Sequence, residues 1–232
     1  MIIILGASGV IGSQLHSMAL DRGESIIGTY HTRPSAGLQK FDISRDSLLD
    51  ALPQLSSSDT VVVLSAYTNP NWIFENSVRA RDLNVVATCH IIDEATSRGA
   101  QIVFLSTEII FPDREDGHTE DSIPAPSTVY AQQKTEVEAY IQENARNVII
   151  ARTGWNVSPD PHSNCPIANT RHLLLSGNAK LARDNWFTLT DVSDTCSVLL
   201  DLIKNKIHGT FHVAANPPIS RIELAEEIVA SS

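Results

Sequence analysis

A glycine-rich turn directly after the first apolar run constrains the fold of this 232-residue chain most strongly. Residues 2–5 are Ile-Ile-Ile-Leu, and residues 6–12 are Gly-Ala-Ser-Gly-Val-Ile-Gly. Gly6 permits a tight exit from a strand, Gly9 lets backbone N–H groups approach a phosphate, and Gly12 lets a helix pack closely. The context predicts a dinucleotide site, with a purely structural turn as the alternative. Its expected contacts are Gly6, Ser8, Gly9, Val10, Ile11 and Gly12.

Short β-branched runs alternate with helical stretches over the first two thirds of the chain. We expect strands at residues 2–5, 25–29, 60–65, 101–106 and 147–152. Helices are expected at residues 10–21, 46–52, about 72–98 and 128–144. Because the strands are apolar throughout, both faces of their sheet should be covered. The pattern predicts an α/β fold with a Rossmann-type, doubly wound parallel sheet.

The alternation changes after residue 152. Residues 154–169 are rich in Pro, Ser and Asn and indicate a loop, followed by a short helix near 167–175. Thr190 and Asp191 should cap a helix that ends near 202, residues 210–213 should form a strand, and Ser220 should cap a helix over 221–230. We therefore expect a dinucleotide-binding domain over 1–153, to which later segments return. Residues 154–232 should form a shortened, non-contiguous substrate-binding region.

Composition excludes several other classes of protein. The net charge of −10 argues against a nucleic-acid partner, which requires a basic surface. Cys89, Cys165 and Cys196 are too scattered for a disulfide framework. We expect no metal site, because Gly209 and a predicted strand from residue 210 keep His208 and His212 from sharing a helical face. No apolar run approaches the length of a membrane span, and residues 1–5 lack the features of a signal peptide. We expect a cytoplasmic protein without a membrane partner.

The end of the second strand indicates which dinucleotide is bound. An acid that would bind a ribose 2′-hydroxyl is missing after Tyr30, where His31, Thr32 and Arg33 follow. Arg33, assisted by Thr32 or His31, can pair with a 2′-phosphate, which favours NADP(H) over NAD(H); the alternative is an exposed loop charge. Asp42 is either a ligand of the adenine amino group or an exposed turn residue. Further cofactor contacts are expected at Tyr30 and, at the ends of later strands, at Ser65, Ala66, Tyr67 and Thr153. Tyr130 and Lys134 are expected to contact the cofactor as well.

Tyr130 and Lys134 are four residues apart near the start of a predicted helix, which places them on one face. A nearby ammonium group should lower the pKa of the phenol and fit it for proton transfer to a carbonyl. Ser106 or Thr107 could donate a hydrogen bond to the substrate oxygen, or could simply cap a turn. Asn84 could hold a water that relays protons to Lys134, or could be a satisfied core amide.

In this order, the glycine turn, Ser106-Thr107 and the Tyr130–Lys134 pair resemble the extended short-chain dehydrogenase/reductases, especially the dTDP-4-dehydrorhamnose reductases. Residues 106–111 are similar to the family's S-T-D-x-V-F stretch, with Glu108 for Asp. Residues 152–155 are similar to its R-T-S-W strand end, and residues 209–213 to its late G-x-Y-H strand. The resemblance implies hydride transfer from NADPH to a keto group of a sugar nucleotide or similar polar small molecule. Tyr130 would be the proton donor, Thr107 and Lys134 would complete the catalytic set, and Asn84 would be a fourth member.

The departures from the family pattern lie on the substrate side. The family's Asn-Phe is Asn164-Cys165 here, its D-Q-x-G-x-P-T segment is residues 184–190, and the chain ends earlier. Substrate contacts are expected from Thr107, Glu108, Asn164 and Trp186, although Trp186 could merely fill space. Two alternative functions stay open: an epimerase or dehydratase that retains NAD, and a non-catalytic NADP-binding regulatory subunit. A homodimer is the oligomer expected from the resemblance.

Overall fold

A computed structural model describes residues 1–114, 116–158, 166–177 and 179–231. Asn164 and Cys165, which were compared with the family's Asn-Phe, lie outside the described residues. Within these residues, seven strands form one sheet in which every strand pair is parallel. Their order across the sheet is β10 (Gly209–Val213), β6 (Val148–Thr153), β5 (Gln101–Thr107), β4 (Thr60–Val63), β1 (Ile2–Leu5), β2 (Ile26–Tyr30) and β3 (Gln39–Lys40).

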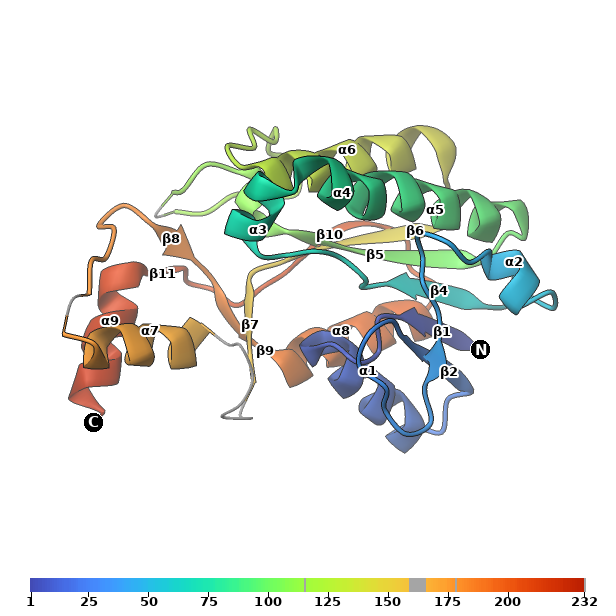
Figure 1. Cartoon of the computed structure of the whole chain (residues 1–232), viewed down its shortest axis with the longest axis horizontal. Helices are drawn as coiled ribbons and strands as arrows, with labels where there is room; N and C mark the ends of the chain where they lie inside the picture. Colours follow the sequence, from blue (N-terminus) through green and yellow to red (C-terminus); the bar gives the residue numbers. More distant parts are fainter. Residues whose placement is uncertain (115, 159–165, 178, 232) are drawn as a thin grey trace.

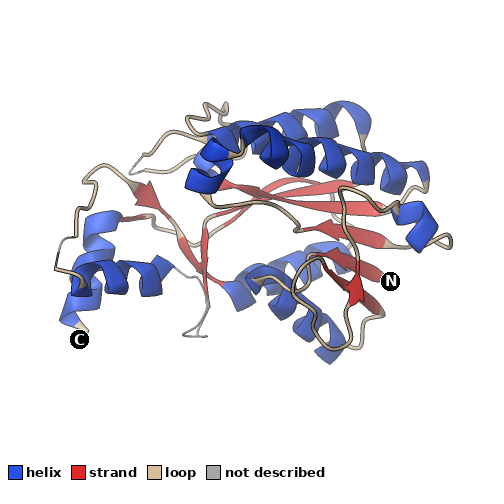
Figure 2. Ribbon diagram, viewed as in Figure 1, coloured by secondary structure: helices blue, strands red, loops and turns tan. Residues whose placement is uncertain are grey.

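Helices cover both faces of this sheet (Figures 1 and 2). One face packs against α5 (Thr88–Ser97) and α6 (Val129–Asn144), and the other against α1 (Val10–Asp21) and α8 (Val192–Lys204). Each strand supplies both cores, because alternate side chains point to opposite faces. In β1, Ile3 and Leu5 join the first core and Ile2 and Ile4 the second. The predicted doubly wound α/β fold is therefore confirmed.

The long helix predicted near residues 72–98 is instead a series of shorter elements. It consists of α3 (Pro70–Glu75), α4 (Ser77–Arg81), a π-helical segment η1 (Asp82–Ala87) and α5. Asn76 ends α3 because its φ of −123° and ψ of 41° leave the helical region. The helix predicted at 46–52 is also shorter, since α2 (Leu48–Ala51) begins only after the Ser47 cap.

The remaining elements form a C-terminal lobe beyond the carboxyl ends of the strands (Figure 1). It contains the pair β7 (Trp155–Val157) and β9 (Leu189–Asp191), the pair β8 (Trp186–Phe187) and β11 (Ile219–Ser220), and the helices α7 (Pro166–Leu175) and α9 (Arg221–Ala230). Between these pieces, α8 and β10 return to the central sheet. No helix in the described ranges is long and apolar enough to span a membrane.

Candidate active site

The glycine turn joins β1 to α1 in a conformation that side chains would block. Gly6 has a φ of +97°, in the region that favours glycine, and a Cβ there would lie 3.0 Å from the Ser65 backbone nitrogen. A Cβ on Gly12 would lie only 2.2 Å from the Gly6 carbonyl oxygen. The two glycines therefore hold the turn against the start of α1 and against the end of β4.

The N-terminus of α1 is open to a ligand. Gly9 is its N-cap, no described side chain caps it, and its first turn contains no acidic residue. The backbone N–H groups at a helix N-terminus carry partial positive charge, and a side chain or an anion normally satisfies them. This turn is thus suited to a phosphate group, as the sequence predicts.

A cleft of about 560 Å³, here called the central cleft, is lined by both this turn and the Tyr130–Lys134 pair. It lies at the carboxyl ends of the strands, where doubly wound sheets bind their ligands. Of the predicted site residues, the structure brings to this cleft Gly6, Gly9, Val10, Ile11, Gly12, Arg33, Ala66, Thr107, Tyr130, Lys134 and Thr153. Ser8 lies within the turn, and Tyr30 ends β2, where its carbonyl accepts a hydrogen bond from the Phe41 N–H at 2.9 Å.

Tyr130 and Lys134 occupy one face of α6 because they are one turn apart. Lys134 Nζ donates a hydrogen bond to the Leu105 carbonyl oxygen at 2.7 Å and lies 5.7 Å from the centroid of the Tyr130 ring. Burial lowers the pKa of Lys134 to about 8, whereas the Glu138 carboxylate one turn further on acts in the opposite direction.

The expected effect of Lys134 on Tyr130 is not found. Burial raises the pKa of the Tyr130 phenol above its usual value, and no charged neighbour contributes to the shift. The physical reason is that desolvation disfavours the phenolate, while the Lys134 ammonium is directed to the Leu105 carbonyl. In this structure the phenol is therefore held in its protonated form at neutral pH.

Two hydroxyls end β5 beside this pair. Thr107 Oγ1 accepts a hydrogen bond from the Ile109 N–H at 3.4 Å and so caps a short 3-10 helix, η2 (Glu108–Ile110). This is the turn-cap role that was the alternative, although the Thr107 O–H remains available as a donor. Ser106 Oγ is buried and has no hydrogen-bond partner among the described residues.

Asn84 connects the loop after β4 to α6. Its Oδ1 accepts from the Tyr67 N–H at 2.8 Å, and its Nδ2 donates to the Tyr67 carbonyl at 2.9 Å and to Gln133 Oε1 at 2.8 Å. The side chain is buried and both amide hydrogens are used. This is the geometry of a satisfied core amide, and none of the hydrogen bonds of the Asn84 side chain reaches Lys134 in the described part of the chain.

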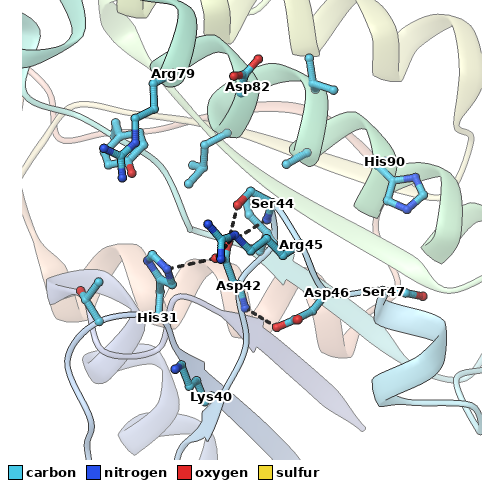
Figure 3. Close-up of a pocket in the computed structure, with 16 residues that line it drawn as sticks. His31, Lys40, Asp42, Ser44, Arg45, Asp46, Ser47, Arg79, Asp82 and His90 are labelled. Atoms are coloured by element: carbon cyan, nitrogen blue, oxygen red, sulfur yellow. Dashed lines mark hydrogen bonds and ion pairs between the residues drawn. The ribbon is translucent and has the colours of Figure 1, made fainter. Parts of the chain in front are cut away.

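A second cleft, here called the side cleft, adjoins the end of β2 and has a volume of about 1030 Å³ (Figure 3). His31 and Asp42 line one wall, and Arg79 and His90 lie on the helices opposite. Thr32 also lines this cleft.

The Asp42 carboxylate binds neighbouring residues, Ser44 and His31, in this wall of the side cleft. Its Oδ1 accepts from the Ser44 N–H at 3.0 Å and the Ser44 hydroxyl at 2.6 Å, and its Oδ2 lies 3.2 Å from His31 Nε2. Burial alone would raise the pKa of the Asp42 carboxyl, but these hydrogen bonds together with His31 and Arg45 lower it below its usual value. Arg33, by contrast, is exposed and forms no ion pair with the described part of the chain.

Glu108 and Trp186 line a different cavity from Thr107. This aromatic pocket, of about 250 Å³, is also walled by Phe111, Phe187 and His212. The Glu108 carboxylate accepts from the Thr188 N–H at 3.1 Å and the Thr188 hydroxyl at 2.8 Å. Burial raises the pKa of Glu108 to about 7, despite these hydrogen bonds. The predicted substrate contacts are thus divided between two cavities.

Gly154, where the family pattern has Ser, allows Glu108 and Thr188 to pack against each other. A Cβ on Gly154 would lie 1.7 Å from Thr188 Oγ1 and 3.0 Å from Glu108 Oε2. Glu108 and Thr188 therefore fill the space that a side chain at position 154 would need.

The lobe adds cleft residues that sequence reasoning did not select. Trp155, Asn156, Pro166 and Asn169 line the central cleft together with the glycine turn. The R-T-S-W-like strand end was a signal for Trp155, since only Gly154 separates it from the end of β6. The other three lie in a loop-like stretch of sequence without a spacing pattern.

Comparison with known proteins agrees with this architecture. The family model described as "RmlD substrate binding domain" matches residues 1–232. Methionine adenosyltransferase 2 subunit beta of Xenopus laevis is 22% identical over 231 residues, covering 96% of this chain and 69% of that protein. The probable low-salt glycan biosynthesis reductase Agl14 of Haloferax volcanii is 22% identical over 233 residues, covering 97% and 78%.

Solved structures show the same fold. A dTDP-4-dehydrorhamnose reductase of Bacillus anthracis in complex with NADP superposes with a TM-score of 0.82 at 23% identity, covering 99% of this chain and 79% of that one. MoeE5 in complex with UDP-glucuronic acid and NAD gives a TM-score of 0.85 at 20% identity, covering 100% and 82%.

Proposed function

The chain belongs to the RmlD substrate binding domain family, and on that premise we propose that it is a nicotinamide-dependent oxidoreductase acting on a nucleotide sugar. The proposed reaction is reduction of a keto group by NADPH, with Tyr130 as the proton donor. The observation that carries the proposal is that one cleft contains both the glycine turn and the Thr107, Tyr130 and Lys134 side chains.

The residues of the central cleft fit a dinucleotide. The close approach of Gly12 to the Gly6 carbonyl and the uncapped α1 N-terminus form a cradle that side chains would fill. The backbone N–H groups of Val10, Ile11 and Gly12 would hold its diphosphate. Ala66 and Thr153 would lie along the cofactor toward β5. The bound cofactor supplies the hydride.

The side chains of the central cleft would carry out the proton transfer to the substrate. The Tyr130 phenol is protonated at neutral pH, and burial raises its pKa further, so its O–H can donate to the oxygen of a keto group as negative charge develops there. Thr107 would orient the same oxygen with a hydrogen bond. Lys134, whose pKa of about 8 keeps it largely cationic at neutral pH, would place its positive charge on the same face of α6 as the phenolate left after the transfer.

The preference for NADPH rests on the end of β2. Arg33 lines the central cleft without a carboxylate partner in the described ranges, and no acid follows Tyr30 to bind a 2′-hydroxyl. A guanidinium group matches a phosphate with two parallel hydrogen bonds. The two solved relatives above contain NADP in one case and NAD in the other.

A non-catalytic subunit is the second candidate function. The similarity to a protein named as a subunit of methionine adenosyltransferase favours it. The presence of Tyr130 and Lys134 in the cleft favours an enzyme, because a binding subunit does not require a proton donor.

The test begins with calorimetric titration of the purified protein with NADPH and NADH, followed by NADPH oxidation with keto sugar nucleotides. We expect tighter binding of NADPH, and Arg33→Ala should reduce that preference. Tyr130→Phe should lower turnover about 100-fold or more while leaving NADPH affinity unchanged. Full activity of Tyr130→Phe would refute the catalytic assignment, and NADPH binding without turnover of any keto sugar would favour the subunit.

A further inference from the structure

A buried carboxylate lies one helical turn beyond the Tyr130–Lys134 pair on α6. Glu138 follows Lys134 by four residues, as Lys134 follows Tyr130, so the three side chains share one face of the helix. Glu138 is 2% exposed and Lys134 is 6% exposed. Because both groups are shielded from water, the attraction between the carboxylate and the ammonium is screened only weakly.

Arg152 of β6 fixes the position of this carboxylate. Its Nη2 donates to Glu138 Oε2 at 2.8 Å, and its Nε donates to both carboxylate oxygens at 3.2 Å. Its Nη1 donates to the Glu120 carbonyl oxygen at 3.0 Å and lies 3.4 Å from His212 Nε2. The Glu138 carboxylate is thus held from the sheet side by a guanidinium group that is itself held in place.

Lys134, Glu138 and Arg152 form a group of three buried charges, of which two are positive. Without the Glu138 carboxylate, two cations would remain buried, and a buried charge is unfavourable unless it is paired. A guanidinium group does not lose its proton in a protein, whereas a buried ammonium group readily does. Lys134 would therefore become neutral in that case.

The surroundings of Lys134 agree with this balance of charges. Burial lowers the pKa of Lys134 to about 8, and the Glu138 carboxylate acts against that decrease. On the same helix face, the centroid of the Tyr130 ring lies 5.7 Å from Lys134 Nζ. Toward β5, Nζ contacts the Leu105 carbonyl oxygen and lies 4.5 Å from the centroid of the Phe104 ring, and neither group titrates.

Titratable side chains on the other elements packed against α6 are exposed or bonded elsewhere. The exposed ones are Glu75 of α3, Asp82 of η1, and His90 and Asp93 of α5. Glu94 of α5 accepts a hydrogen bond from the Ser47 hydroxyl at 2.6 Å, and Glu108 of η2 accepts from Thr188. Burial raises the pKa of the Cys89 thiol of α5 to about 11, so it stays neutral. The charges of these groups are therefore screened by solvent or held by other partners.

We propose that Glu138 is a positioning residue for the proton transfer: its carboxylate keeps the buried Lys134 cationic beside Tyr130, and Arg152 holds that carboxylate in place. The inference rests on the proposed function, since it concerns the ammonium group of the same site. Lys134 is among the described residues that line the central cleft and Glu138 is not, so Glu138 acts through Lys134.

The experiment is an NMR titration of the full-length protein labelled with ¹³C at the lysine Cε atoms. The Lys134 signal is the one that is missing from Lys134→Met, and its midpoint gives the pKa of the ammonium group directly. Glu138→Gln should lower this pKa by about 1–3 pH units, the effect of removing an opposite charge a few ångströms away. Under the proposed function, the pH above which turnover falls should decrease by the same amount.

Arg152 variants separate an effect of charge from a loss of structure. Arg152→Gln breaks the same ion pair but keeps the Glu138 carboxylate, so the pKa of Lys134 should stay at or above its wild-type value. If Glu138→Gln is unstable because the Arg152 guanidinium loses its partner, the double variant Glu138→Gln, Arg152→Gln replaces it. The double variant lacks both charges of the pair and should also lower the pKa of Lys134.

Glu136→Gln is the matched control, since Glu136 is an exposed carboxylate on the opposite face of α6, where it pairs with Arg81. It should leave the pKa of Lys134 unchanged, because solvent screens an exposed charge. Thermal unfolding reports whether each variant is folded. An unchanged Lys134 pKa in both Glu138→Gln and the double variant, or an equal decrease in Glu136→Gln or Arg152→Gln, would overturn the inference.

Failure of this inference can be told apart from failure of the proposed function, because the titration needs no substrate. If Glu138→Gln leaves the pKa of Lys134 unchanged while the wild type reduces a keto sugar nucleotide, the inference is wrong and the reaction stands. If the pKa of Lys134 falls as expected but no keto sugar is reduced, the effect of Glu138 on Lys134 stands and the reaction is wrong.

Discussion

At Gly12, the absence of a side chain allows α1 to lie against the turn after β1. A Cβ there would lie 2.2 Å from the Gly6 carbonyl oxygen, which is backbone and cannot rotate away. We expect Gly12→Ala to destabilise the protein by about 1–3 kcal/mol or more, as overpacking does, and to abolish NADPH binding. Denaturant unfolding and calorimetry measure the two effects.

Gly9→Ala is the control for that variant. A Cβ on Gly9 would lie 3.4 Å from the same carbonyl, at an ordinary contact distance, and the φ of −82° suits any residue. Gly9→Ala should therefore fold with near-native stability. Similar destabilisation of both variants would show that the close approach of Gly12 is not the cause.

Glu108 should make the stability of the protein depend on pH. Burial raises its pKa from 4.5 to about 7 in the folded protein. A carboxyl whose pKa is higher in the folded state contributes stability that is fully present below its unfolded pKa and is lost as the pH rises through its folded pKa. From pH 4 to pH 8 the wild type should lose about 3 kcal/mol of unfolding free energy relative to Glu108→Gln. Urea unfolding across this range measures the difference, and parallel curves would contradict the prediction.

Several residues of the site could be predicted because local spacing determines their positions. The glycines follow a strand directly, and Tyr130 and Lys134 are one helical turn apart, so each set lies together in any fold that keeps these elements. The rise in the pKa of Tyr130 could not be predicted, because it depends on burial by segments distant in sequence. The separation of Glu108 and Trp186 from Thr107 likewise depends on how the lobe packs.

At the scale of elements, Asn84 fixes the loop after β4 to the helix that carries Tyr130. Asn84→Ala should remove three hydrogen bonds, one buried and two partly buried, and destabilise the protein by about 2–4 kcal/mol. If Asn84 is a positioning residue, turnover will fall while its dependence on pH keeps the same shape. A proton relay through Asn84 would instead shift the pH profile. Asn205→Ala, which removes an exposed amide at the end of α8, is the control.

The strands of the sheet were more predictable than the helices on its surface. Each of β1, β4, β5 and β6 contains an unbroken run of three or four apolar residues, a property of the sequence itself. The break at Asn76 and the π-helical turn of η1 leave the apolar pattern unchanged, so periodicity alone predicts one long helix. The short strands of the lobe are two or three residues long and carry too little pattern to be recognised.

For the whole molecule, residues 1–153 should not fold alone, although the sequence places the dinucleotide-binding domain there. Leu15 and Ala19 of α1 share a core with Cys196 and Leu199 of α8, which lies far along the chain. Without α8 and β10, one face of the sheet would expose this apolar surface. A fragment ending at residue 153 should bind a hydrophobic dye and unfold without a cooperative transition. The full chain is the control, and a sharp unfolding transition of the fragment would contradict the prediction.

The chain enters or leaves the C-terminal lobe at three places, after β6, before α8 and after β10. Each crossing lies at the carboxyl edge of the sheet, and none interrupts the strands that carry the glycine turn or the proton donor. In related proteins the lobe segments between these junctions can therefore be lengthened, shortened or replaced, while the carboxyl edge of the sheet stays unchanged. Substrate choice and chemistry are thus free to evolve at different rates within one gene product.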